Sequence, residues 1–484
     1  MKALPVDFEN RMKNLLGDEF SSYKASLEEE PVRSFRINTD KISLEDFNKI
    51  NIFNTEKIPY SPTGFYFDYE KIGNHPYHHA GMIYVQEPGA MAPAECLTIG
   101  EDWLCLDMCS APGGKSTQLR NKLGENGILV SNEIIPSRCK ILTSNVERLG
   151  LKNVITTCMD SERIARLYPK TFDFIMVDAP CSGEGMFRKE QIAIDEWSKE
   201  NVEKCATRQK EILENASRCL KNGGYIVYAT CTFSLEENEM LIDEFLSNHP
   251  EFELLRVNEE VEKNTSDGIF FDVCKCENIT FTRRVYPHKN KGEGQFMALL
   301  HNTDPEAQSK FSKNSKSSNV KIEKSVFEFL DGVLTTYDKA CVKMNNDTPI
   351  YFNGDFDTTN AVVNPTASII PSAAPITAPP TTNFNNLYKL APIITGIAKK
   401  KVNSAAISLD VPINIAPRIV APDLEVPGIK ESTWNIPIIA AVLKVKSFNV
   451  VIFESLSLFL FSTIINNIPY IISINATVNG LYKY

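Results

Sequence analysis

Features common in secreted and membrane proteins are scarce in this sequence. Its 484 residues include only 12 cysteines, too few for a disulfide scaffold, and no C-x-x-C pair of the kind that binds zinc. The first ten residues, MKALPVDFEN, lack the apolar core of a secretory signal. We therefore expect a cytoplasmic protein with reduced thiols, in which any cysteine with a role beyond packing is catalytic or metal-binding.

Basic charge is scarce as well. Lys and Arg number 51 against 61 Asp and Glu, which gives a net charge of −10. This balance argues against a protein coated with basic surface, but it permits a confined basic groove. Hydrophobic residues at 43% and charged residues at 23% are ordinary for a globular protein, and they exclude a wholly disordered or collagen-like chain.

Composition and periodicity divide the chain into regions. Residues 1–95 combine a helical pattern with an aromatic, turn-rich stretch, which predicts a small α+β domain. In residues 96–301, amphipathic helical stretches alternate with short apolar runs at 103–108, 127–131, 154–159, 172–177 and 225–229. Such alternation predicts an α/β fold with a mostly parallel sheet and helices on both faces. The sequence contains no internal repeat.

The C-terminal third differs from the rest in composition. Residues 302–345 begin with a polar, lysine-rich stretch that predicts a linker. Only 17 of the 140 residues from 345 to 484 are charged, and no cysteine follows Cys341. We expect residues 346–484 to be an atypical tail, either disordered or frameshifted. Its apolar run at 448–474 is interrupted by Glu454 and Pro469, so we expect neither a membrane-spanning helix nor a membrane partner.

A turn of small residues follows the apolar run at 103–108. The sequence CSAPGGKSTQL (109–119) is similar to a phosphate-binding loop, but Cys109 stands where that loop needs its first glycine, and the dinucleotide pattern G-x-G-x-x-G is also missing. Binding of S-adenosylmethionine (SAM) is the third interpretation, because glycines and the start of a helix let backbone amides approach a ligand. The cofactor-binding residues predicted in this turn are Cys109, Ser110, Ala111, Pro112, Gly113, Gly114 and Lys115.

Acidic residues close the next two apolar runs. Glu133 ends ILVSNE about twenty residues after Gly113, which is the spacing of ribose-binding acids in this type of fold. Asp160 ends VITTCMD, where a carboxylate can accept a hydrogen bond from the adenine amine. Either acid alone is more often an ordinary polar residue at a strand end, but their register with the turn favours a cofactor site.

Two cysteines follow the fourth and fifth predicted strands. FDFIMVD (172–178) leads through Asp178 to Cys181, and GGYIVYAT (223–230) leads to Cys231. Ligands of open α/β sheets bind at the carboxyl ends of strands, so both cysteines should face one cleft from neighbouring strands at the switch point. Beside a methyl donor, a thiolate can add to C6 of cytosine and make C5 nucleophilic. Asp178 would contact the Watson–Crick edge of the base, which must be single-stranded, looped or flipped out.

Structural explanations compete with these assignments. A single cysteine at a strand end is more often a small buried hydrophobic residue. No metal site is predicted, because His75, His78 and His79 lack a nearby pattern of acids or thiols, and Cys274 and Cys276 have no evident partners.

Three long motifs resemble those of a known enzyme family. LDMCSAPGGKSTQL (106–119), VDAPCSGEGMFRK (177–189) and YATCTFSLEENE (228–239) are similar to the signatures of the NOL1/NOP2/Sun family of RNA cytosine-5 methyltransferases. FRIN (35–38), HPYHHAG (75–81), YVQEPGAMAPAE (84–95) and HKNKGEGQFMALL (288–300) resemble the bacterial small-subunit rRNA methyltransferase F group of that family. The resemblance covers about residues 1–300 and implies a Rossmann-like, SAM-dependent methyltransferase core.

The resemblance also implies roles for individual residues. Cys231 matches the nucleophile of the family, and Cys181 matches the cysteine that assists product release. SAM binding falls on the turn at 109–115 and on the acids at Glu133, Asp160 and Asp178. Arg138 matches a further position beside the cofactor, and the family's N-terminal segment, here about 1–95, helps to hold RNA.

RNA is the implied partner. We expect a monomeric enzyme that acts on small-subunit (16S) rRNA; the alternatives are the same chemistry on tRNA, or a non-catalytic RNA-binding ribosome-assembly factor. Relatives usually continue into an intermediate domain and a PUA-like RNA-binding domain, and residues 327–351 are compatible with the start of that region. The candidates for contacts to RNA phosphates are Arg188, Lys189, Arg283, Arg284, Lys289 and Lys291.

Overall fold

The computed structural model describes residues 3–305 and, further along the chain, residues 324, 327, 331, 342–345 and 348–351. The chain separates into two compact units, one of residues 1–142 and 153–316 and the other of residues 143–152 and 317–484. Apart from 348–351, the predicted tail at 346–484 lies outside the described residues. The region boundaries proposed from the sequence stay predictions.

The first unit begins with two helices and a small antiparallel sheet. Helices α1 (Val6–Leu16) and α2 (Phe20–Ser26) precede a four-stranded sheet of order β2-β3-β1-β4. Its strands are β1 (Ser34–Ile37), β2 (Asn54–Lys57), β3 (Gly64–Asp68) and β4 (Ile83–Val85). Helices α3 (Leu44–Ile50) and α4 (Pro76–His79) complete a small α+β region, which confirms the prediction from the sequence.

Aromatic side chains of this region enter two separate cores. The ring of Phe35 in β1 lies between 5.4 and 6.0 Å from those of Phe53, Phe65 and Phe67, in the core of the four-stranded sheet. Phe8 of α1 instead packs on Phe187 and Trp197, at ring-centroid distances of 4.8 and 5.6 Å. Helix α1 therefore packs against the segment that follows Cys181.

A nine-stranded mixed sheet forms the centre of the unit. Its order is β11-β12-β13-β9-β8-β5-β6-β7, with β10 also paired to β13. The parallel half consists of β5 (Leu104–Asp107), β6 (Ile128–Asn132), β7 (Val154–Thr157), β8 (Phe172–Asp178) and β9 (Leu220–Thr230). The antiparallel half consists of β10 (Phe252–Leu255), β11 (Ser266–Asp267), β12 (Arg283–Val285) and β13 (Gln295–Asn302). The five apolar runs of the sequence are the five parallel strands, whereas the antiparallel extension was not predicted.

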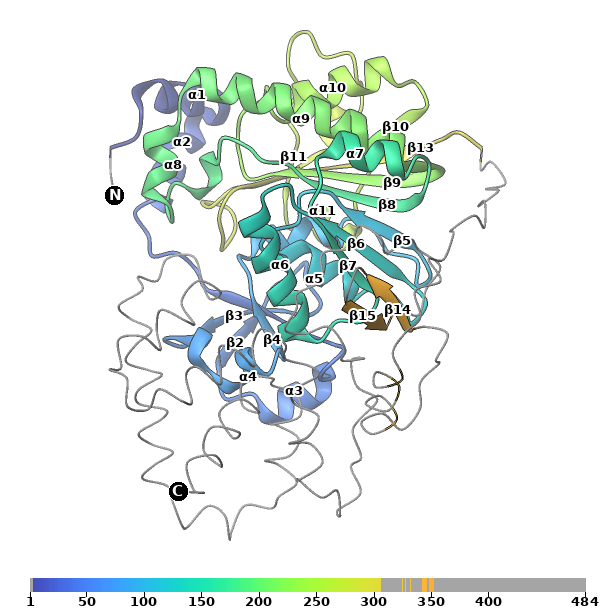
Figure 1. Cartoon of the computed structure of the whole chain (residues 1–484). Coiled ribbons are helices and arrows are strands. Elements are labelled where there is room, and N and C mark those ends of the chain that lie inside the picture. Colours follow the sequence, from blue (N-terminus) through green and yellow to red (C-terminus); the bar gives the residue numbers. More distant parts are fainter. Residues whose placement is uncertain are drawn as a thin grey trace, which may run out of the picture. The chain divides into compact units, whose positions relative to one another are not determined.

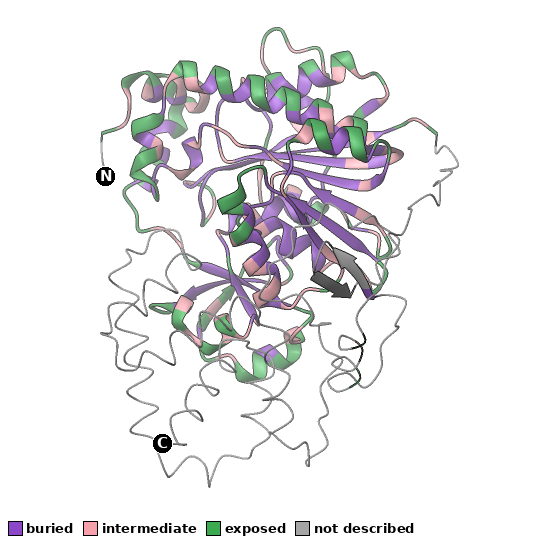
Figure 2. Cartoon of the chain, viewed as in Figure 1, coloured by how far each residue is buried: buried purple, intermediate pink, exposed green. Residues whose placement is uncertain are grey.

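Helices cover both faces of this sheet. On one face α7 (Ser161–Leu167), α9 (Lys199–Cys219) and α10 (Glu239–Asn248) pack together, with α9 against β8 and β9, and α5 (Gly114–Arg120) lies on the other face (Figure 1). The short helix η3 (Gly89–Glu95) contacts α5, β9 and β13. Figure 2 shows the strands between the two layers buried along most of their length. The remaining helical elements are η1 (Gly17–Glu19), η2 (Ile72–Asn74), α6 (Pro136–Leu149), η4 (Glu184–Met186), α8 (Gln191–Glu196), α11 (Glu259–Lys263) and η5 (Ile279–Phe281).

The strand order corrects one detail of the sequence prediction. The strands that lead to Cys181 and Cys231, β8 and β9, are parallel neighbours as expected. However, the chain runs from β5 outward to β6 and β7 and then returns to β8 on the other side of β5. The switch point therefore lies between β5 and β8, where the turn at 109–115 faces Asp178. Cys181 and Cys231 instead follow β8 and β9, the next pair of strands in the sheet.

In the second unit, β14 (Val342–Asn345) pairs with β15 (Thr348–Tyr351) as an antiparallel hairpin.

Candidate active site

The turn between β5 and α5 is fixed by hydrogen bonds from several elements. Gly113 has a φ of 112°, in the left-handed region that favours glycine. The Ser110 amide donates to the Asn132 carbonyl at 2.8 Å, which ties the turn to the end of β6. Cys109 is half-buried, and burial raises the pKa of its thiol. The turn is thus a formed backbone loop at the carboxyl end of β5, and Cys109 is a poor candidate for a thiolate.

Asp107, the last residue of β5, provides a test of whether this turn suits SAM. It is fully buried, and burial raises the pKa of its carboxyl to about 7. Ser116 Oγ donates to Asp107 Oδ2 at 2.5 Å, while Oδ1 has no hydrogen-bond partner among the described residues. A buried acceptor without a donor is costly, and the ammonium group of a methionine moiety is a donor of the kind it needs. The residues present therefore fit SAM.

Glu133 and Arg138 are connected to the same turn. Glu133 follows β6, is 3% exposed, and accepts a hydrogen bond from the Ile135 amide at 2.9 Å. Arg138 Nη1 lies 3.2 Å from Glu133 Oε2, and its Nη2 donates to the Ala111 carbonyl at 2.8 Å. Arg138 thus joins the predicted ribose-binding acid to the cofactor turn, an arrangement that sequence spacing alone does not reveal.

Asp160 is exposed and has a local structural role. Its Oδ1 accepts a hydrogen bond from the Arg163 amide at 2.8 Å, which caps the N-terminus of α7. Its contact with the cofactor stays a prediction.

The two candidate catalytic cysteines are in contact. Cys181 Sγ and Cys231 Sγ are 3.3 Å apart, and both side chains are half-buried. The hydrogen bond with Cys231, together with burial, raises the pKa of the Cys181 thiol well above its ordinary range. Cys181 therefore keeps its proton at neutral pH and can donate it in a hydrogen bond to the neighbouring sulfur.

A buried lysine lies beside these sulfurs. Lys115 Nζ is 2.7 Å from Asp178 Oδ2, and the lysine side chain is 9% exposed. Although burial opposes its charge, Asp178 and, to a smaller extent, Cys231 raise the pKa of Lys115. The ammonium group therefore lies close enough to Cys231 for the two groups to interact, while its direct partner is the Asp178 carboxylate.

The loop that carries Cys231 packs closely against two glycines from other segments, Gly185 and Gly294, and leaves no room for a side chain at Gly185. The Gly185 amide donates to the Cys231 carbonyl at 2.8 Å. A Cβ on Gly185 would lie 2.9 Å from that carbonyl oxygen and 2.7 Å from the Gly294 backbone. The backbone segments of Gly185, Cys231 and Gly294 therefore meet at one point. Gly294 belongs to the HKNKGEGQF motif, to which the sequence analysis gave no structural role.

Arg36, in the FRIN motif, is a residue whose role sequence reasoning missed. It is 1% exposed and donates to Gln86 Oε1 at 2.6 Å, to the Gly114 carbonyl at 2.9 Å and to Thr117 Oγ1 at 2.7 Å. The signal that could have found it is an arginine in an otherwise apolar strand. It connects β1 of the N-terminal region to Gly114, near the end of the cofactor turn, and to Thr117 in the first turn of α5.

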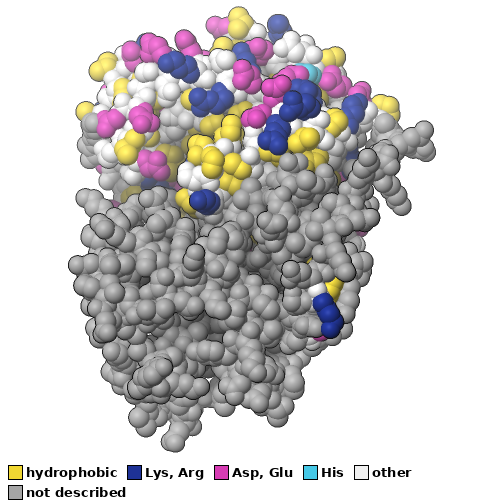
Figure 3. Space-filling view, viewed as in Figure 1, with side chains coloured by type: hydrophobic (Ala, Val, Ile, Leu, Met, Phe, Trp, Pro, Cys, Tyr) yellow, Lys and Arg dark blue, Asp and Glu magenta, His cyan; other side chains and the backbone are white. Residues whose placement is uncertain are grey.

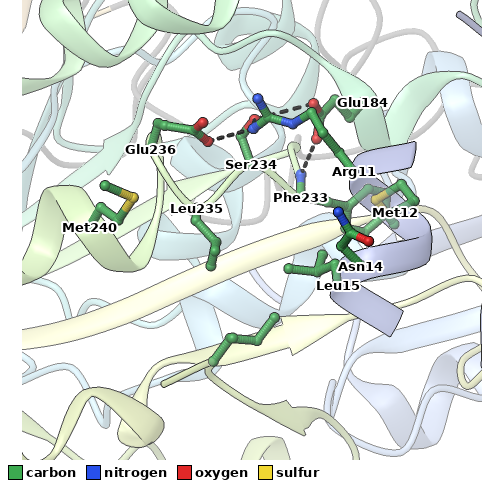
Figure 4. Close-up of a pocket in the computed structure, with 11 residues that line it drawn as sticks. Arg11, Met12, Asn14, Leu15, Glu184, Phe233, Ser234, Leu235, Glu236 and Met240 are labelled. Atoms are coloured by element: carbon green, nitrogen blue, oxygen red, sulfur yellow. Dashed lines mark hydrogen bonds and ion pairs between the residues drawn. The ribbon is translucent and has the colours of Figure 1, made fainter. Parts of the chain in front are cut away.

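A cavity of about 370 Å³ lies near the cysteine loops but not at the sulfurs (Figure 4). Its walls come from α1 and from the segments that follow Cys181 and Cys231. Arg11 reaches across it to Ser234 Oγ at 3.0 Å and to Glu236 Oε2 at 2.5 Å. The lining includes neither cysteine nor any residue of the 109–115 turn, so we do not assign the chemistry to this cavity.

The prediction of phosphate contacts is wrong for three arginines. Arg188, Arg283 and Arg284 are each at most 9% exposed. They form ion pairs with Glu293, Asp267 and Glu239, respectively. The lysines at 189, 289 and 291 are more exposed, although they too have acidic partners. On the described part of the face in Figure 3, acidic and basic side chains are interspersed.

Two further classes of site are absent from the described residues. No group of three or more His, Cys, Asp or Glu side chains there could hold a metal ion. In the same part of the chain, no helix combines the length and apolarity that crossing a membrane requires.

The fold and the site define a Rossmann-like SAM-dependent methyltransferase: a parallel sheet with a switch point, a glycine turn after its first strand and an acid after its second. Residues 94–301 match the family described as 16S rRNA methyltransferase RsmB/F, and residues 4–88 match the N-terminal domain of 16S rRNA methyltransferase RsmF. The chain belongs to the RsmB/F family of methyltransferases.

Individual relatives agree with this assignment. The ribosomal RNA small subunit methyltransferase F of Vibrio vulnificus (strain YJ016) is 34% identical over 352 residues, which cover 68% of this chain and 72% of the relative. The protein of the same name from Erwinia tasmaniensis is 33% identical over 308 residues, 61% of this chain and 63% of the relative.

Solved structures with the same fold come from Pyrococcus horikoshii. A methyltransferase homolog protein superposes with a TM-score of 0.54 at 30% identity, covering 61% of this chain and 94% of the homolog. NSun6, crystallised with SFG, superposes with a TM-score of 0.52 at 23% identity, covering 62% of this chain and 98% of NSun6.

Proposed function

We propose that the chain methylates C5 of a cytosine in small-subunit (16S) rRNA, with SAM as the methyl donor and Cys231 as a covalent nucleophile. The observation that carries the proposal is the 3.3 Å contact between Cys181 Sγ and Cys231 Sγ, at the carboxyl ends of adjacent parallel strands and beside the Lys115–Asp178 ion pair. Two thiols in contact next to a cofactor turn suit a reaction that needs both covalent addition and elimination.

The residues that would hold SAM are those of the turn at 109–115 together with Glu133, Arg138, Asp160 and Asp178. Glu133 is preorganised for ribose hydroxyls by its bonds to Arg138 and the Ile135 amide. Asp107, which the sequence did not single out, offers its unpaired Oδ1 to the ammonium group. When bound, SAM supplies the methyl group that the C5 carbon accepts.

Cys231 is the residue we assign to attack. Its thiolate forms a C–S bond to C6 of the cytosine, and the electron pair of the 5,6 double bond becomes available at C5 for the methyl group. The C5 proton must then leave to a base, after which the double bond reforms and the C–S bond breaks with its electrons returning to sulfur. The ammonium group of Lys115 stabilises the negative charge on the sulfur before addition and after elimination.

Cys181 and Asp178 have supporting roles in this proposal. Cys181 lies against the sulfur that must leave, so we assign it to product release. We assign Asp178, whose Oδ2 lies 2.7 Å from Lys115 Nζ, to contact the Watson–Crick edge of the base and support the charge change at N3.

The relatives' names support rRNA as the substrate, and a bacterial rRNA substrate fits a cytoplasmic enzyme. A base inside a duplex cannot reach a cysteine at a strand end, so we expect the target nucleotide to be unpaired or flipped out. We assign the holding of RNA to residues 1–95, whose α1 borders the segments that follow both cysteines.

A covalent-trapping gel tests this function. Wild type, Cys181→Ala and Cys231→Ala are incubated with small-subunit rRNA and SAM, denatured, and examined for a protein–RNA adduct. We expect a stalled adduct in Cys181→Ala, because addition proceeds without release, and none in Cys231→Ala. Cys276→Ala, a half-buried cysteine outside the site, is the matched control and should behave as wild type.

The absence of any adduct on rRNA or tRNA, in variants that still bind SAM, would overturn covalent catalysis. An adduct on tRNA but not on rRNA would keep the chemistry and replace the substrate.

A further inference from the structure

Glu237 is a buried carboxylate whose bonds reach outside its own segment. It follows Cys231 by six residues, just before α10, and is 0% exposed. Its Oε2 accepts a hydrogen bond from the Ser182 amide at 2.9 Å, and its Oε1 accepts one from Ser182 Oγ at 2.5 Å. Both bonds therefore go to the residue immediately after Cys181.

A side chain of α9 also binds the loop that carries Cys181. Gln209 Nε2 lies 3.0 Å from the Pro180 carbonyl and 2.8 Å from Glu237 Oε2. Ser182 Oγ is also 2.8 Å from Thr232 Oγ1. Pro180 and Ser182, the two neighbours of Cys181, are therefore both held by a network that centres on Glu237.

The adjacent residue, Asn238, makes a different set of bonds. Thr230 Oγ1 donates to Asn238 Oδ1 at 2.6 Å, and Asn238 Nδ2 donates to the Thr232 carbonyl at 3.0 Å. These partners are the two neighbours of Cys231. Two successive buried side chains thus bind different loops: Asn238 is bonded to both neighbours of Cys231, and Glu237 is bonded to Ser182, next to Cys181.

We infer that Glu237 is a positioning residue that holds Cys181 against Cys231 and so controls release of the methylated base rather than its capture. This inference rests on the proposed function, in which Cys231 captures the base and Cys181 assists its release. Burying a carboxylate is costly, and a position that needed only packing would take an apolar side chain. The cost is offset by three hydrogen bonds, two of which come from the residue next to Cys181.

The inference makes different predictions for the two neighbouring residues. In Glu237→Ala the loop at 180–183 loses its main acceptor while Cys231 keeps the bonds of Asn238, so addition proceeds and elimination slows. We expect the stalled adduct to accumulate. A small misplacement of reacting groups slows a reaction strongly, so kcat should fall about 10- to 100-fold, while the KM for RNA should stay near that of wild type. In Asn238→Ala the nucleophile itself is misplaced, so we expect less adduct than in wild type.

Glu237→Gln is the conservative variant. Its amide oxygen can accept from the Ser182 amide and from Gln209, and its NH2 group can donate to Ser182 Oγ, so turnover should recover most of the loss in Glu237→Ala. A residue that mattered only through its charge would not be rescued in this way.

The experiment measures adduct on denaturing gels, single-turnover methyl transfer and unfolding temperature for Glu237→Ala, Glu237→Gln and Asn238→Ala, beside Cys181→Ala and Cys231→Ala. Both alanine variants remove buried hydrogen bonds, so a purely structural role would lower the adduct in both alike, which would overturn the inference. Should Glu237→Ala not fold, Ser182→Ala removes the two bonds of Ser182 Oγ, to Glu237 and to Thr232, but keeps the bond of the Ser182 amide to Glu237, and it must still accumulate adduct. Failure of Cys181→Ala to give adduct would instead refute the proposed function, and the inference would fall with it.

Discussion

Cys181 and Cys231 lie fifty positions apart in the sequence, yet their sulfur atoms are separated by 3.3 Å. The register of the parallel strands accounts for this. Asp178, at the end of β8, pairs with Ala229 near the end of β9, so that Cys181 and Cys231 follow their paired residues by three and two positions. Similar short loops from adjacent strand ends then bring the side chains to one point. The contact is a property of the sheet as much as of either loop.

Asp107 should make the stability of the free protein depend on pH. Burial raises its pKa to about 7, whereas the unfolded carboxyl has the ordinary value of 3.8. Between pH 4 and 7 the unfolded chain therefore loses a proton that the folded chain keeps, and the free energy of unfolding falls as the pH rises. Because the two pKa values of Asp107 differ by about three units, the free energy of unfolding should fall by about 4 kcal/mol over this pH range. Asp107→Asn removes this group, so its stability should fall less over the same range.

Urea unfolding of wild type and Asp107→Asn at several pH values from 5 to 7.5 measures the effect. The comparison between variants is needed because Glu237 also has its pKa raised to about 7 by burial, and contributes a slope of the same sign to both proteins. Parallel stability profiles for the two proteins would show that Asp107 ionises normally in the folded state. Added SAM should protect wild type more strongly above pH 7, where the ionised carboxylate can pair with the ammonium group.

Much of this site follows from local sequence patterns. The turn at 109–115, Glu133 and the two cysteines each stand at the end of an apolar run, and parallel strands bring such ends to one edge. Local pattern does not reveal which side chains reach across the edge. The Lys115–Asp178 pair, the Arg138 bridge and the network of Glu237 join residues from 5 to more than 60 positions apart, and each depends on tertiary packing.

Gly294→Ala should displace the loop of Cys231. A Cβ at this position would lie 2.3 Å from Phe233 Cζ and 2.7 Å from Gly185 Cα. Phe233 cannot yield easily, because its ring stacks on Tyr286 at 5.4 Å. We expect a loss of about 1–3 kcal/mol in the free energy of unfolding, as for overpacked cores, together with a loss of adduct formation.

Gly73→Ala is the matched control, because a Cβ there meets no atom within 4 Å. Thermal unfolding and the trapping gel on both variants provide the measurement. Equal behaviour of the two variants would mean that the backbone at Gly294 relaxes without moving Cys231.

The arginines show where reasoning from composition failed. Clusters of Arg and Lys near the catalytic motifs suggested phosphate contacts, but a sequence does not show which cations already have a partner. Arg284 and Glu239 are 45 positions apart and both fully buried, with the guanidinium group paired to the carboxylate. Burial opposes the charge of Arg284, but the pairing with Glu239 outweighs it and raises the pKa of the guanidinium group. Such a pair belongs to the core, and RNA phosphates do not reach it.

Arg36→Ala should weaken SAM binding by removing a hydrogen bond to Gly114, near the end of the cofactor turn. The guanidinium group donates hydrogen bonds to the Gly114 carbonyl and to Thr117 Oγ1 at the start of α5. Its removal deletes both bonds, while the 3.2 Å bond from Thr117 Oγ1 to the Gly114 carbonyl remains. Hydrogen bonds from a charged donor contribute about 1.5–3 kcal/mol, so we expect stability to fall by about 3 kcal/mol and SAM affinity to fall several-fold. Arg33→Ala, which removes an exposed side chain with one 3.4 Å contact to the Tyr69 carbonyl, should change stability by less than about 0.5 kcal/mol. Calorimetric titration with SAM and urea unfolding of both variants decide the matter. If Arg36→Ala loses stability but binds SAM as wild type does, then the arginine only secures the N-terminal region, and the cofactor turn holds its shape without it.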